Sequence, residues 1–574
     1  MNFVAYLATE FFKRKKWTAL GIFIVSLLNS VIQTNGMTHI TSNIITFAQT
    51  RNQAKAYEFF KYFICIVIVF IAVYYLWSYL QNQLLTEIRP WVREKIVELL
   101  LKTNNQKFSE TNFSKLNSPI NRIVDMYYFI THTVLDYMLP NLAYLVIVSI
   151  YFTFINPYYG LIFLIGNALL ALYWYFNVKS IMKSNDDYEK TIIKSDIHLI
   201  DLLNNVDKII YRGQTDPEIQ TFDGLSKMNI KKGQEYYDLS NYHITVMTTI
   251  IFAVVLVSIY MLLRLYFNKK VDITLFITSF TILLLYREKM STMIETLPEL
   301  VDFIGRTENV LIHFQHVNDN YREYASSKPY EKQSMEFRKI QFHNVTYKYG
   351  ASATNVFENR DYFLKTEKNQ IIGITGPSGN GKSTFVKLLL RMYECNSGKI
   401  TIDDVDVKDI DPDYIRREIT YVNQNSKLFD RKVVDNMLYG CNNREICDHF
   451  LEQILKYPNI TKLYRNTDIK NKDAGLLGEN LSGGQRQIVN MIGGLINPSK
   501  ILILDEPTNA LDPNLKKEVL GLIKDFSKYK QAVIIITHDK DVFPLFTQQL
   551  QFWGNLKVPS YSLRSTWGNL KVSP

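Results

Sequence analysis

The sequence predicts a multidomain membrane protein, in which a six-helix α-helical transmembrane domain precedes a soluble α/β domain that binds phosphate. Three observations predict this fold class. The chain has 574 residues, enough for two or more domains. Long apolar runs rich in Phe, Tyr, Ile and Leu end near Met290, and an ordinary α/β composition follows Tyr321. The stretch Gly376–Ser383 fills every fixed position of the phosphate loop G-x-x-x-x-G-K-[ST].

Charge and cysteine content narrow the class further. The formal net charge is +10, and Lys and Arg gather beside apolar runs, as in Lys13–Lys16. This placement favours a membrane protein. No basic stripe with interleaved aromatic residues is present, so we expect no nucleic-acid partner. The four cysteines have neither metal-ligand spacing nor a disulfide framework, which favours a reducing compartment for the soluble half.

Six apolar runs are predicted to cross the lipid bilayer. The predicted spans are 17–37, 59–80, 131–155, 158–176, 244–265 and 273–285. We interpret the first run as a retained helix, because it is long for a signal peptide and has no small-x-small cleavage site. The basic cluster before it places the N-terminus in the cytoplasm. Long polar segments follow the second and fourth spans, and each is long enough to continue the membrane helices into the cytoplasm.

Several polar residues lie within these spans: Asn29, Gln33, Asn35, His132, Asp136, Asn141 and Asn167. His132 and Asp136 are four residues apart and can share a helix face. They indicate either a cavity lining or a coupled ion pair. Taken singly, each polar residue fits an interhelical hydrogen bond or a helix end near the interface better than a functional role.

The predicted domain layout has four parts: a transmembrane domain (1–317), a linker (318–335), an α/β domain with the phosphate loop (336–545) and a C-terminal tail of unclear role (546–574). Beyond His538 no further strand is recognisable. The tail repeats a six-residue stretch, Trp553–Val558 and Trp567–Val572, which we interpret as a small hairpin or an artefact rather than a functional element.

The phosphate loop has the context that its chemistry requires. The apolar run Ile371–Thr375 predicts a strand before it, and residues 384–390 predict a helix after it. The glycines allow the backbone N–H groups to approach phosphate oxygens, and the helix N-terminus adds a favourable dipole. Lys382 is expected to bind the β- and γ-phosphates, and the Ser383 hydroxyl is expected to bind Mg²⁺.

Polar residues follow three predicted strands of the soluble half. The apolar run Ile501–Leu504 ends at Asp505 and Glu506, a pair suited to holding Mg²⁺ and to polarising an attacking water as general base. Two other strands end near Gln424, which can reach Mg²⁺ or that water, and His538, which can contact the γ-phosphate. An adenine ring could stack on Tyr349, with Tyr347 as the rival candidate.

Leu481–Gln485 reads Leu-Ser-Gly-Gly-Gln and lies between the phosphate loop and Asp505. With these motifs the chain resembles an exporter-type half-transporter of the ABC transporters (type IV fold), up to about residue 545. The resemblance implies ATP and Mg²⁺ as cofactors. The implied nucleotide-binding residues are Tyr349, Gly376, Ser378, Gly379, Asn380, Gly381, Lys382, Ser383, Thr384, Ser482, Gly483, Gly484 and Gln485. The implied catalytic residues are Glu506, His538 and Gln424, and the implied Mg²⁺ ligands are Ser383, Gln424 and Asp505.

The resemblance also implies a dimer. Each ATP would lie between the phosphate loop of one cassette and the Ser482–Gln485 stretch of another, with Asp512 at the cassette interface. Short coupling helices are implied near Phe108–Ser118 and Tyr211–Glu218. The chain departs from the family at Leu476–Leu477, where Glu-Arg is usual, and at Gly493–Gly494, where two glycines weaken a helix by about 1 kcal/mol each relative to Ala.

The resulting hypothesis is ATP-driven export across a membrane by alternating access, with a second copy of the chain as partner. The alternatives are a nucleotide-gated or regulatory membrane ATPase that moves no substrate, and one half of a heterodimeric exporter. The substrate and the membrane stay open. A cavity with several aromatic residues and few fixed charges would suit lipids, hydrophobic peptides or drug-like compounds, but the same residues would also serve to pack six helices.

Overall fold

The structure is a computed structural model that describes residues 3–106, 117–311, 334–350, 354–424, 427–463, 471–509 and 511–552. The chain divides into two compact units near residue 319, and each is described by itself. The predicted linker lies almost entirely outside the described residues, as do the repeated stretches of the tail. The implied coupling helix near Phe108 also lies outside them, apart from its last residues.

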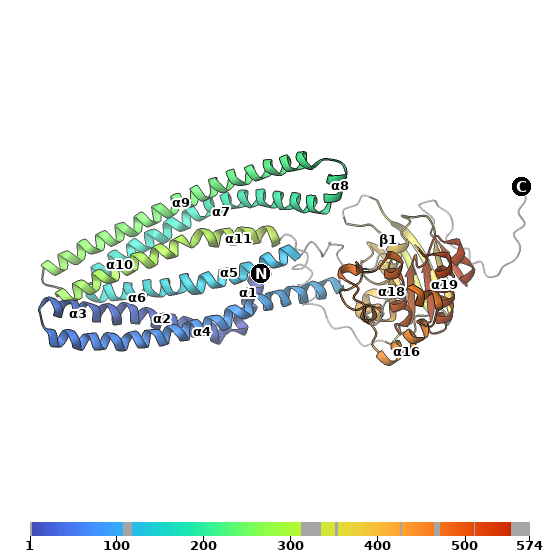
Figure 1. The fold of residues 1–574 in the computed structure, drawn as a ribbon, viewed down its shortest axis with the longest axis horizontal. Coiled ribbons are helices and arrows are strands. Elements are labelled where there is room, and N and C mark those ends of the chain that lie inside the picture. The colour runs from blue at the N-terminus through green and yellow to red at the C-terminus, as the bar shows by residue number, and fades with distance from the viewer. Residues whose placement is uncertain are drawn as a thin grey trace, which may run out of the picture. The chain divides into compact units, whose positions relative to one another are not determined.

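The first unit is entirely helical in the part that the structure describes (Figure 1). Its long helices are joined by short links at Thr50–Asn52, Asn156 and Asn268–Asp272. The helices are α1 (Phe3–Arg14), α2 (Lys16–Val31), η1 (Ile32–Met37), α3 (Thr38–Gln49), α4 (Gln53–Gln106), α5 (Asn117–Thr133), η3 (Val134–Met138), α6 (Leu139–Ile155), α7 (Pro157–Asn204), α8 (Val206–Tyr211), α9 (Thr215–Phe267), α10 (Ile273–Glu295) and α11 (Leu297–Leu311).

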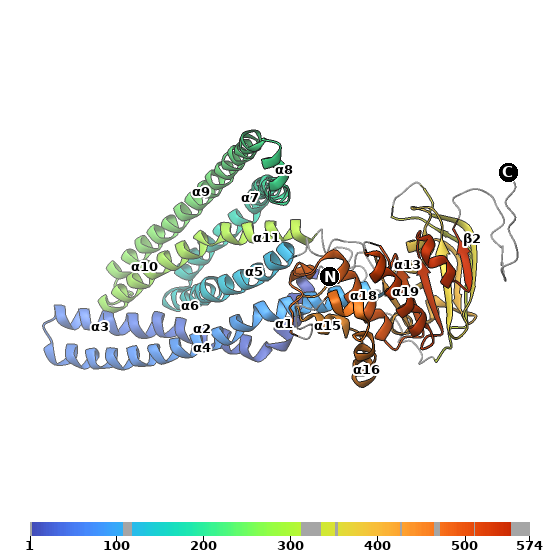
Figure 2. The same ribbon diagram turned by 45° about the vertical axis from the view of Figure 1, so that its right-hand side comes forward.

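The long polar segments of the sequence continue the helices, as predicted. Helix α7 runs on to Asn204 and α9 starts at Thr215, with the short helix α8 between them (Figure 1). Figure 2 shows the same α7–α8–α9 arrangement from another side. At the place of the coupling helix implied near Tyr211–Glu218, the structure has the end of α8 at Tyr211 and the start of α9 at Thr215.

Among the described residues, five helical segments are long and apolar enough to cross a membrane: Lys16–Gln49, Gln53–Lys102, Ile120–Ile155, Pro157–Asn204 and Thr215–Phe267. The sixth predicted span corresponds to α10, which is not among them. Its apolar part is short, because Arg287, Glu288 and Lys289 interrupt it. Helix α10 nevertheless packs within the unit, where Ile282, Leu283 and Tyr286 are buried with side chains of α6, α7 and α9.

The polar residues of the spans form contacts between helices. The Tyr286 hydroxyl of α10 donates to Asn167 Oδ1 of α7 at 2.6 Å. His132 and Asp136 form an ion pair at 2.8 Å, and Asp136 also accepts a hydrogen bond from Gln81 of α4. Asp136 is therefore both a member of an ion pair and a residue that lines a cavity, so both interpretations apply.

The second unit contains two sheets. A five-stranded parallel sheet has the order β6-β7-β8-β3-β9, with β6 (Ile419–Val422), β7 (Ile501–Asp505), β8 (Ala532–Ile536), β3 (Gln370–Thr375) and β9 (Gln548–Gln551). An antiparallel sheet has the order β2-β1-β4-β5, with β2 (Phe357–Lys365), β1 (Lys339–Tyr347), β4 (Ser397–Ile402) and β5 (Val405–Asp406). Every residue of β7 and β8 is buried, as their continuous apolar runs predict.

Helices cover the parallel sheet. The α-helices are α13 (Lys382–Leu389), α14 (Pro412–Glu418), α15 (Val433–Met437), α16 (Arg444–Ile454), α17 (Pro458–Leu463), α18 (Gly483–Ile496) and α19 (Pro513–Ser527). The 3₁₀ helices are η5 (Val407–Asp409), η6 (Leu476–Gly478) and η7 (Lys540–Leu545). Apolar residues of α18 and α19 pack with alternate residues of β7 and β8 in one core, while the other residues of these strands pack with α13 and the antiparallel sheet in a second core.

The predicted end of the α/β domain at residue 545 was wrong. After η7, strand β9 pairs with β3, and Phe552 is buried in the core behind it. The sequence Gln548-Gln549-Leu550-Gln551 has no apolar run, because β9 is an edge strand whose alternate residues are exposed. Sequence patterns that identify buried strands therefore do not detect it.

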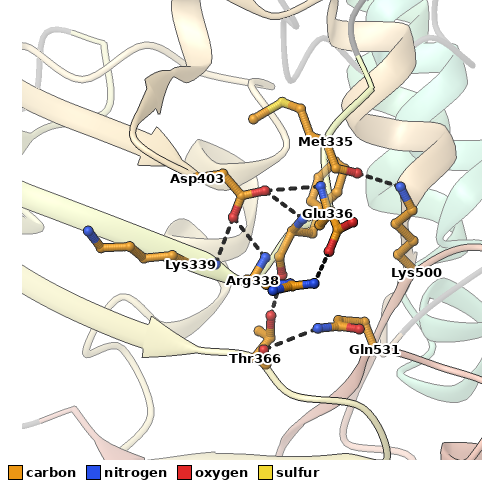
Figure 3. A network of polar contacts seen from close by, with 9 residues as sticks. Met335, Glu336, Arg338, Lys339, Thr366, Asp403, Lys500 and Gln531 are labelled. Carbon is orange, nitrogen blue, oxygen red and sulfur yellow. Dashed lines mark hydrogen bonds and ion pairs between the residues drawn. The ribbon is translucent and has the colours of Figure 1, made fainter.

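The chain enters the second unit through a network centred on Asp403 (Figure 3). The Asp403 carboxylate accepts hydrogen bonds from four successive backbone N–H groups, those of Glu336, Phe337, Arg338 and Lys339, at 2.7 to 3.1 Å. Thr366 donates to the Phe337 carbonyl, and Lys500 donates to that of Met335. This arrangement fixes the start of β1.

One disulfide bond is present in the second unit, although the cysteine spacing shows no disulfide framework. Cys441 and Cys447 form a disulfide bond, with their Cα atoms 6.6 Å apart. A turn at Gly440 and the start of α16 bring the two residues together. Cysteine spacing alone did not reveal this proximity, because it depends on where the helix begins.

Candidate functional site

The phosphate loop connects β3 to α13, as predicted. Gly376, Gly379 and Gly381 have φ angles of 142°, 82° and 87°, in the region that favours glycine. At Gly376, a Cβ atom would lie 2.2 Å from the Phe552 carbonyl oxygen, so the loop also needs glycine for space. The first N–H groups of α13 face this loop, and such groups together with the helix dipole suit an anion.

Lys382 is the first residue of α13, and its side chain reaches back to the loop. Its ammonium donates to the carbonyls of Gly376 and Pro377 at 2.8 and 3.0 Å, and it lies 3.0 Å from His538 Nε2. Burial lowers the pKa of Lys382, while Glu506 and Asp505 act in the opposite direction. The Lys382 ammonium group therefore contacts both the phosphate loop and His538, which follows β8.

Asp505 ends β7 next to the loop. Its Oδ2 accepts from the Tyr421 hydroxyl at 2.9 Å and from the Ser383 hydroxyl at 3.4 Å. Burial raises the pKa of Asp505, and these two hydrogen bonds and the Lys382 charge oppose the rise. A hydroxyl and a carboxylate this close are oxygen ligands that Mg²⁺ prefers, so the residues present fit this ion.

Glu506 follows Asp505 in an unusual conformation. Its φ is 52°, a left-handed value that is uncommon for a residue other than glycine. The Glu506 N–H donates to the Ile536 carbonyl of β8 at 2.8 Å, and its own carbonyl accepts from Gln487 of α18 at 2.8 Å. These two bonds hold the backbone in place, so the side chain has a fixed direction.

The Glu506 carboxylate lies close to two other residues. His538 Nε2 is 3.8 Å away, and the Thr537 hydroxyl donates to Glu506 Oε2 at 3.4 Å. Burial raises the pKa of Glu506, and the neighbouring His538 opposes the rise. A carboxyl group with a raised pKa at the end of a core strand has the properties of a general base.

The structure separates the two candidate adenine-stacking residues. Tyr347 is 4% exposed and packs in the core of the antiparallel sheet. Tyr349 is half-buried, and its hydroxyl lies 3.0 Å from that of Thr384 at the start of α13. Its ring contacts Tyr393, with centroids 5.5 Å apart. Tyr349 therefore offers the accessible aromatic surface beside the phosphate loop.

The Leu-Ser-Gly-Gly-Gln stretch starts α18. Ser482 is the N-cap, and it forms a capping box with Gln485 through bonds of 3.3 and 2.9 Å. Ser482 and Gly483 are exposed. Within the described residues, no hydrogen bond joins Ser482, Gly483 or Gly484 to the phosphate loop of the same chain. The stretch therefore presents a capped helix N-terminus toward the outside of the unit.

A cavity of about 580 Å³ lies beside Asp505. Gln424 lines it together with Gln487, Leu476 and Leu477. Gln424 is exposed and lies just after β6, at the same edge of the sheet as Asp505. The two leucines that replace the usual Glu-Arg are 63% and 50% exposed, and Leu477 has a φ of 57°. Asp512, by contrast, caps α19 through the N–H groups of Asn514 and Leu515.

The adjacent glycines of α18 are explained by packing. A Cβ at Gly494 would lie 2.5 Å from Val422 Cγ2 and 3.0 Å from Leu502 Cδ1, and a Cβ at Gly493 would lie 3.0 Å from the Met437 carbonyl. The two glycines let α18 approach the sheet and α15 closely. They strengthen this contact at the expense of helix propensity.

Two family models match the chain. One, described as the ABC transporter transmembrane region, matches residues 18–289, and the other, described as ABC transporter, matches residues 360–509. Together they cover most of the described part of both units. The chain belongs to the ABC transporters. It has the organisation of a half-transporter, with one membrane region followed by one cassette.

Individual relatives align over part of the chain. An export ATP-binding/permease protein of Rickettsia typhi is 35% identical over 223 residues, which are 39% of this chain and 37% of that protein. A beta-(1→2)glucan export ATP-binding/permease protein of Bartonella quintana is 34% identical over 203 residues, which are 35% and 33%. The chain thus spans about a third of the length of these curated relatives.

The fold itself matches over nearly the whole chain. A solved structure of a bacterial Atm1-family ABC exporter with ATP bound superimposes with a TM-score of 0.74, covering 94% of this chain and 93% of the other. The sequence identity is 17%, so this likeness concerns the fold alone. It covers both units, including the membrane helices that the sequence identified by layout only.

Sequence reasoning missed four residues that hold the site together: Tyr421, Gln487, Thr537 and Phe552. Tyr421 and Thr537 lie in or directly after predicted strands, so their position was visible but their bonds to Asp505 and Glu506 were not. Phe552 contacts the loop through its carbonyl, which accepts from Asn380 at 3.3 Å. No sequence signal marks a backbone contact of this kind.

Proposed function

We propose that this half-transporter binds ATP and Mg²⁺, hydrolyses the ATP and uses the energy to export a substrate across a membrane. One observation carries the proposal: Lys382 of the phosphate loop and the carboxylates at the end of β7 meet at one edge of the parallel sheet. This sheet follows a unit of helices that are long and apolar enough to span a bilayer.

Binding of the nucleotide would fall to the loop and its surroundings. The N–H groups from Ser378 to Thr384 and the Lys382 ammonium would hold the phosphates, and Tyr349 would stack on the adenine. Lys382 would then exchange its bonds to the Gly376 and Pro377 carbonyls for bonds to phosphate oxygens. Ser383 and Asp505 would hold Mg²⁺, with Gln424 approaching from the end of β6. The bound metal would neutralise charge on the phosphates.

Glu506 would act as the general base. Its backbone, held by Ile536 and Gln487, directs the carboxylate to the site, and burial raises its pKa above the ordinary value. His538 lies 3.8 Å from Glu506 and 3.0 Å from Lys382. It would bind the γ-phosphate while in contact with both residues.

A second copy of the chain would complete each site. The Ser482–Gln485 stretch lies at an exposed helix N-terminus, where it is available to the nucleotide of a partner. Asp512, at the start of α19, would lie at the same cassette interface. Since every catalytic residue is present in this chain, a homodimer would contain two competent sites. A heterodimer with a homologous half-transporter is the alternative.

Cassette closure would drive alternating access in the membrane unit. The helix α8, between the long helices α7 and α9, would transmit the motion. The N-terminus and the cassette would lie in the cytoplasm, because the basic cluster Lys13–Lys16 precedes the first span. The relatives from Rickettsia and Bartonella are described as export proteins, which supports the direction of transport.

The test is ATP hydrolysis by the purified full-length protein in lipid nanodiscs. Wild-type protein should hydrolyse ATP with Mg²⁺ and stop when EDTA is added. Glu506→Gln should reduce turnover by roughly 10²-fold or more, since it removes the general base. Asp448→Asn also replaces a carboxylate by an amide, but at an exposed residue paired with Arg444, and it should have no effect. A folded dimer without turnover would overturn the proposal and favour a gating or regulatory role.

A further inference from the structure

The Cys441–Cys447 disulfide has no part in the nucleotide site described above. It closes the turn that leads into α16, and residues 442–444 of this turn are exposed. Cys441 is partly exposed, whereas Cys447 is fully buried. A reagent that approaches from the solvent therefore reaches Cys441 more readily than Cys447.

The second unit does not need this bond to hold its fold. Disulfides are typical of small secreted domains that lack a sufficient apolar core, whereas this unit has two cores of buried apolar side chains. The two cysteines are only six residues apart, so the bond closes a short loop and removes little entropy from the unfolded chain. In the cytoplasm, where we place the cassette, disulfides are usually transient and redox-sensing.

The surroundings of the two sulfur atoms suit the reduced pair as well as the bond. Cys441 Sγ lies 3.0 Å from the Asn443 carbonyl oxygen, and Cys447 Sγ lies 3.5 Å from the Ile496 carbonyl oxygen. Sulfur atoms in a disulfide carry no proton, but each thiol of the reduced pair could donate a weak hydrogen bond to its carbonyl. The buried thiol of Cys447 would therefore have an acceptor.

Both sides of the disulfide lie against the C-terminal end of α18. Ile496, which Cys447 Sγ approaches, is the last residue of this helix. On the other side, a Cβ atom at Gly440 would lie 3.4 Å from the side-chain nitrogen of Asn497, the C-cap of α18. Helices α15 and α16, which flank the disulfide, share a core with α18 (Figure 2). The bond therefore restrains the packing at one end of α18.

The other end of α18 belongs to the proposed nucleotide site. Ser482 is its N-cap, and the exposed stretch Ser482–Gln485 is the part that would contact the nucleotide of a second copy. Gln487, within the helix, donates to the Glu506 carbonyl at 2.8 Å. One helix thus joins the disulfide to the residues proposed to bind and hydrolyse ATP.

We propose that Cys441 and Cys447 form a redox site that exchanges with a dithiol and thereby controls how readily α18 closes on the nucleotide. The inference rests on the proposed function, because it concerns the regulation of that site. The partner is defined by its chemistry, as a molecule or protein that carries two neighbouring thiols.

Reduction proceeds by thiol–disulfide exchange. A thiolate of the dithiol attacks Cys441 Sγ, the bond between the cysteines breaks, and Cys447 leaves as a thiolate that takes up a proton. The second thiolate of the dithiol then attacks its own sulfur in the mixed disulfide and releases Cys441, which is also protonated. Two electrons and two protons pass from the dithiol to the protein, and the dithiol becomes a disulfide. The reverse exchange with that disulfide restores the bond.

The oxidised form should bind ATP more tightly. With the disulfide in place, the C-terminal end of α18 packs against a cross-linked turn, so less conformational freedom is lost when its N-terminus closes on the nucleotide. Reduction frees the turn and increases this loss. The KM for ATP should therefore rise on reduction, while the groups that carry out hydrolysis stay the same.

The experiment compares oxidised and reduced full-length protein in nanodiscs. Dithiothreitol is the reducing dithiol, and diamide restores the bond. Alkylation followed by mass spectrometry reports the state of each cysteine. Two properties are measured in each state: the kinetics of ATP hydrolysis and amide hydrogen exchange of residues 483–496. Cys441→Ser removes the bond, and Cys395→Ser is the matched control, since Cys395 is a free cysteine of the same unit.

Dithiothreitol should open the bond in the folded protein. We expect reduction to raise the KM for ATP by about threefold or more, with kcat within about twofold, and to speed hydrogen exchange in α18. Cys441→Ser should behave as the reduced wild type does and should not respond to dithiothreitol. Cys395→Ser should switch as the wild type does. Comparison of the two states of the wild type decides the question even where Cys441→Ser does not fold.

Three outcomes would overturn the inference: a bond that dithiothreitol does not open in the folded protein, unfolding of the cassette on reduction, or opening that changes neither the KM nor the exchange of α18. Loss of the proposed function gives a different result. If neither state hydrolyses ATP but exchange in α18 still responds to reduction, the redox site stands and the proposed ATP hydrolysis does not.

Discussion

The candidate site carboxylates of the second unit lie at the end of a buried strand, whereas Asp136 and Glu288 of the first unit lie within helices. Asp505 and Glu506 come immediately after Ile501–Leu504, and their neighbours Ser383, Tyr421 and Thr537 satisfy them with hydrogen bonds. Asp136 and Glu288 lie in the interior of helical segments, and only Asp136 has an ion-pair partner among the described residues.

The difference follows from the environment of each unit. In a parallel sheet the strand ends lie at one edge, so consecutive apolar residues in the sequence locate the site. In a membrane unit the apolar side chains cover the outside and polar groups lie between helices. Their partners come from other helices, as Gln81 of α4 does for Asp136, and local sequence does not identify them.

The largest effect is expected at Asp505. Asp505→Asn removes a negative charge from the proposed Mg²⁺ site and leaves the bonds from Tyr421 and Ser383 with a weaker acceptor. We expect ATP turnover to fall by roughly 10²-fold or more, in line with other losses of electrostatic stabilisation in active sites. The measurement is Mg²⁺-dependent hydrolysis in nanodiscs. Turnover within about twofold of the wild type would contradict the assignment of the site.

The next largest effect is expected at Asp403, whose carboxylate accepts four backbone hydrogen bonds. Asp403→Asn keeps the left-handed backbone, since Asn tolerates a φ of 48°, but removes the charge and half of the acceptors. We expect a loss of about 2 kcal/mol in the free energy of unfolding of the second unit. Chemical unfolding followed by far-UV circular dichroism would measure this loss.

The neighbouring Asp404 provides the matched control. It also has a positive φ, 69°, but its carboxylate is exposed and pairs with the Lys339 ammonium at 2.8 Å. Asp404→Asn should change stability by less than about 0.5 kcal/mol. Equal losses at the two positions would show that the backbone bonds to Asp403 carry no special stability.

A smaller effect is expected from the same change in the membrane unit. Asp136→Asn removes the ion pair with His132 and weakens the bond from Gln81, but the unfolded helices can find other polar partners. We expect a loss of about 1 kcal/mol, as measured for interhelical hydrogen bonds in membranes. Thermal unfolding in nanodiscs would detect it. Asp125→Asn, at an exposed residue paired with Arg89 at 3.3 Å, should be neutral. A loss at Asp136 as large as that at Asp403 would remove the distinction between the units.

The same contrast explains how much the sequence could predict. Phosphate-loop residues, strand β7 and its two carboxylates were found in their predicted places, because each motif spans consecutive residues with one backbone conformation. The helical extensions α7 and α9 were also predicted. The π segments were not, since η1 and η3 have the composition of the helices around them.

Contacts between distant segments were beyond sequence reasoning in both units. Gly493 and Gly494 looked like defects in α18, yet Gly494 brings the helix against Val422 and Leu502. Edge strand β9 was missed because its pairing with β3 depends on backbone bonds and its residues are half exposed. In each case the physical cause is a neighbour from another part of the chain, which no local pattern records.

The smallest expected effect concerns the pH dependence of hydrolysis. As the proposed general base, Glu506 must be ionised, so activity should fall as the pH drops through its pKa, which burial raises above the ordinary value. The Thr537 hydroxyl donates to the carboxylate at 3.4 Å and favours the ionised form. Thr537→Val removes this donor, so the pKa of Glu506 should rise further and the acid limb of the kcat profile should move to higher pH. Thr508→Val, the same change at a residue that donates to Asp539 instead, should leave the limb in place. A shift to lower pH in Thr537→Val, or an equal shift in both variants, would show that a group other than Glu506 controls the acid limb.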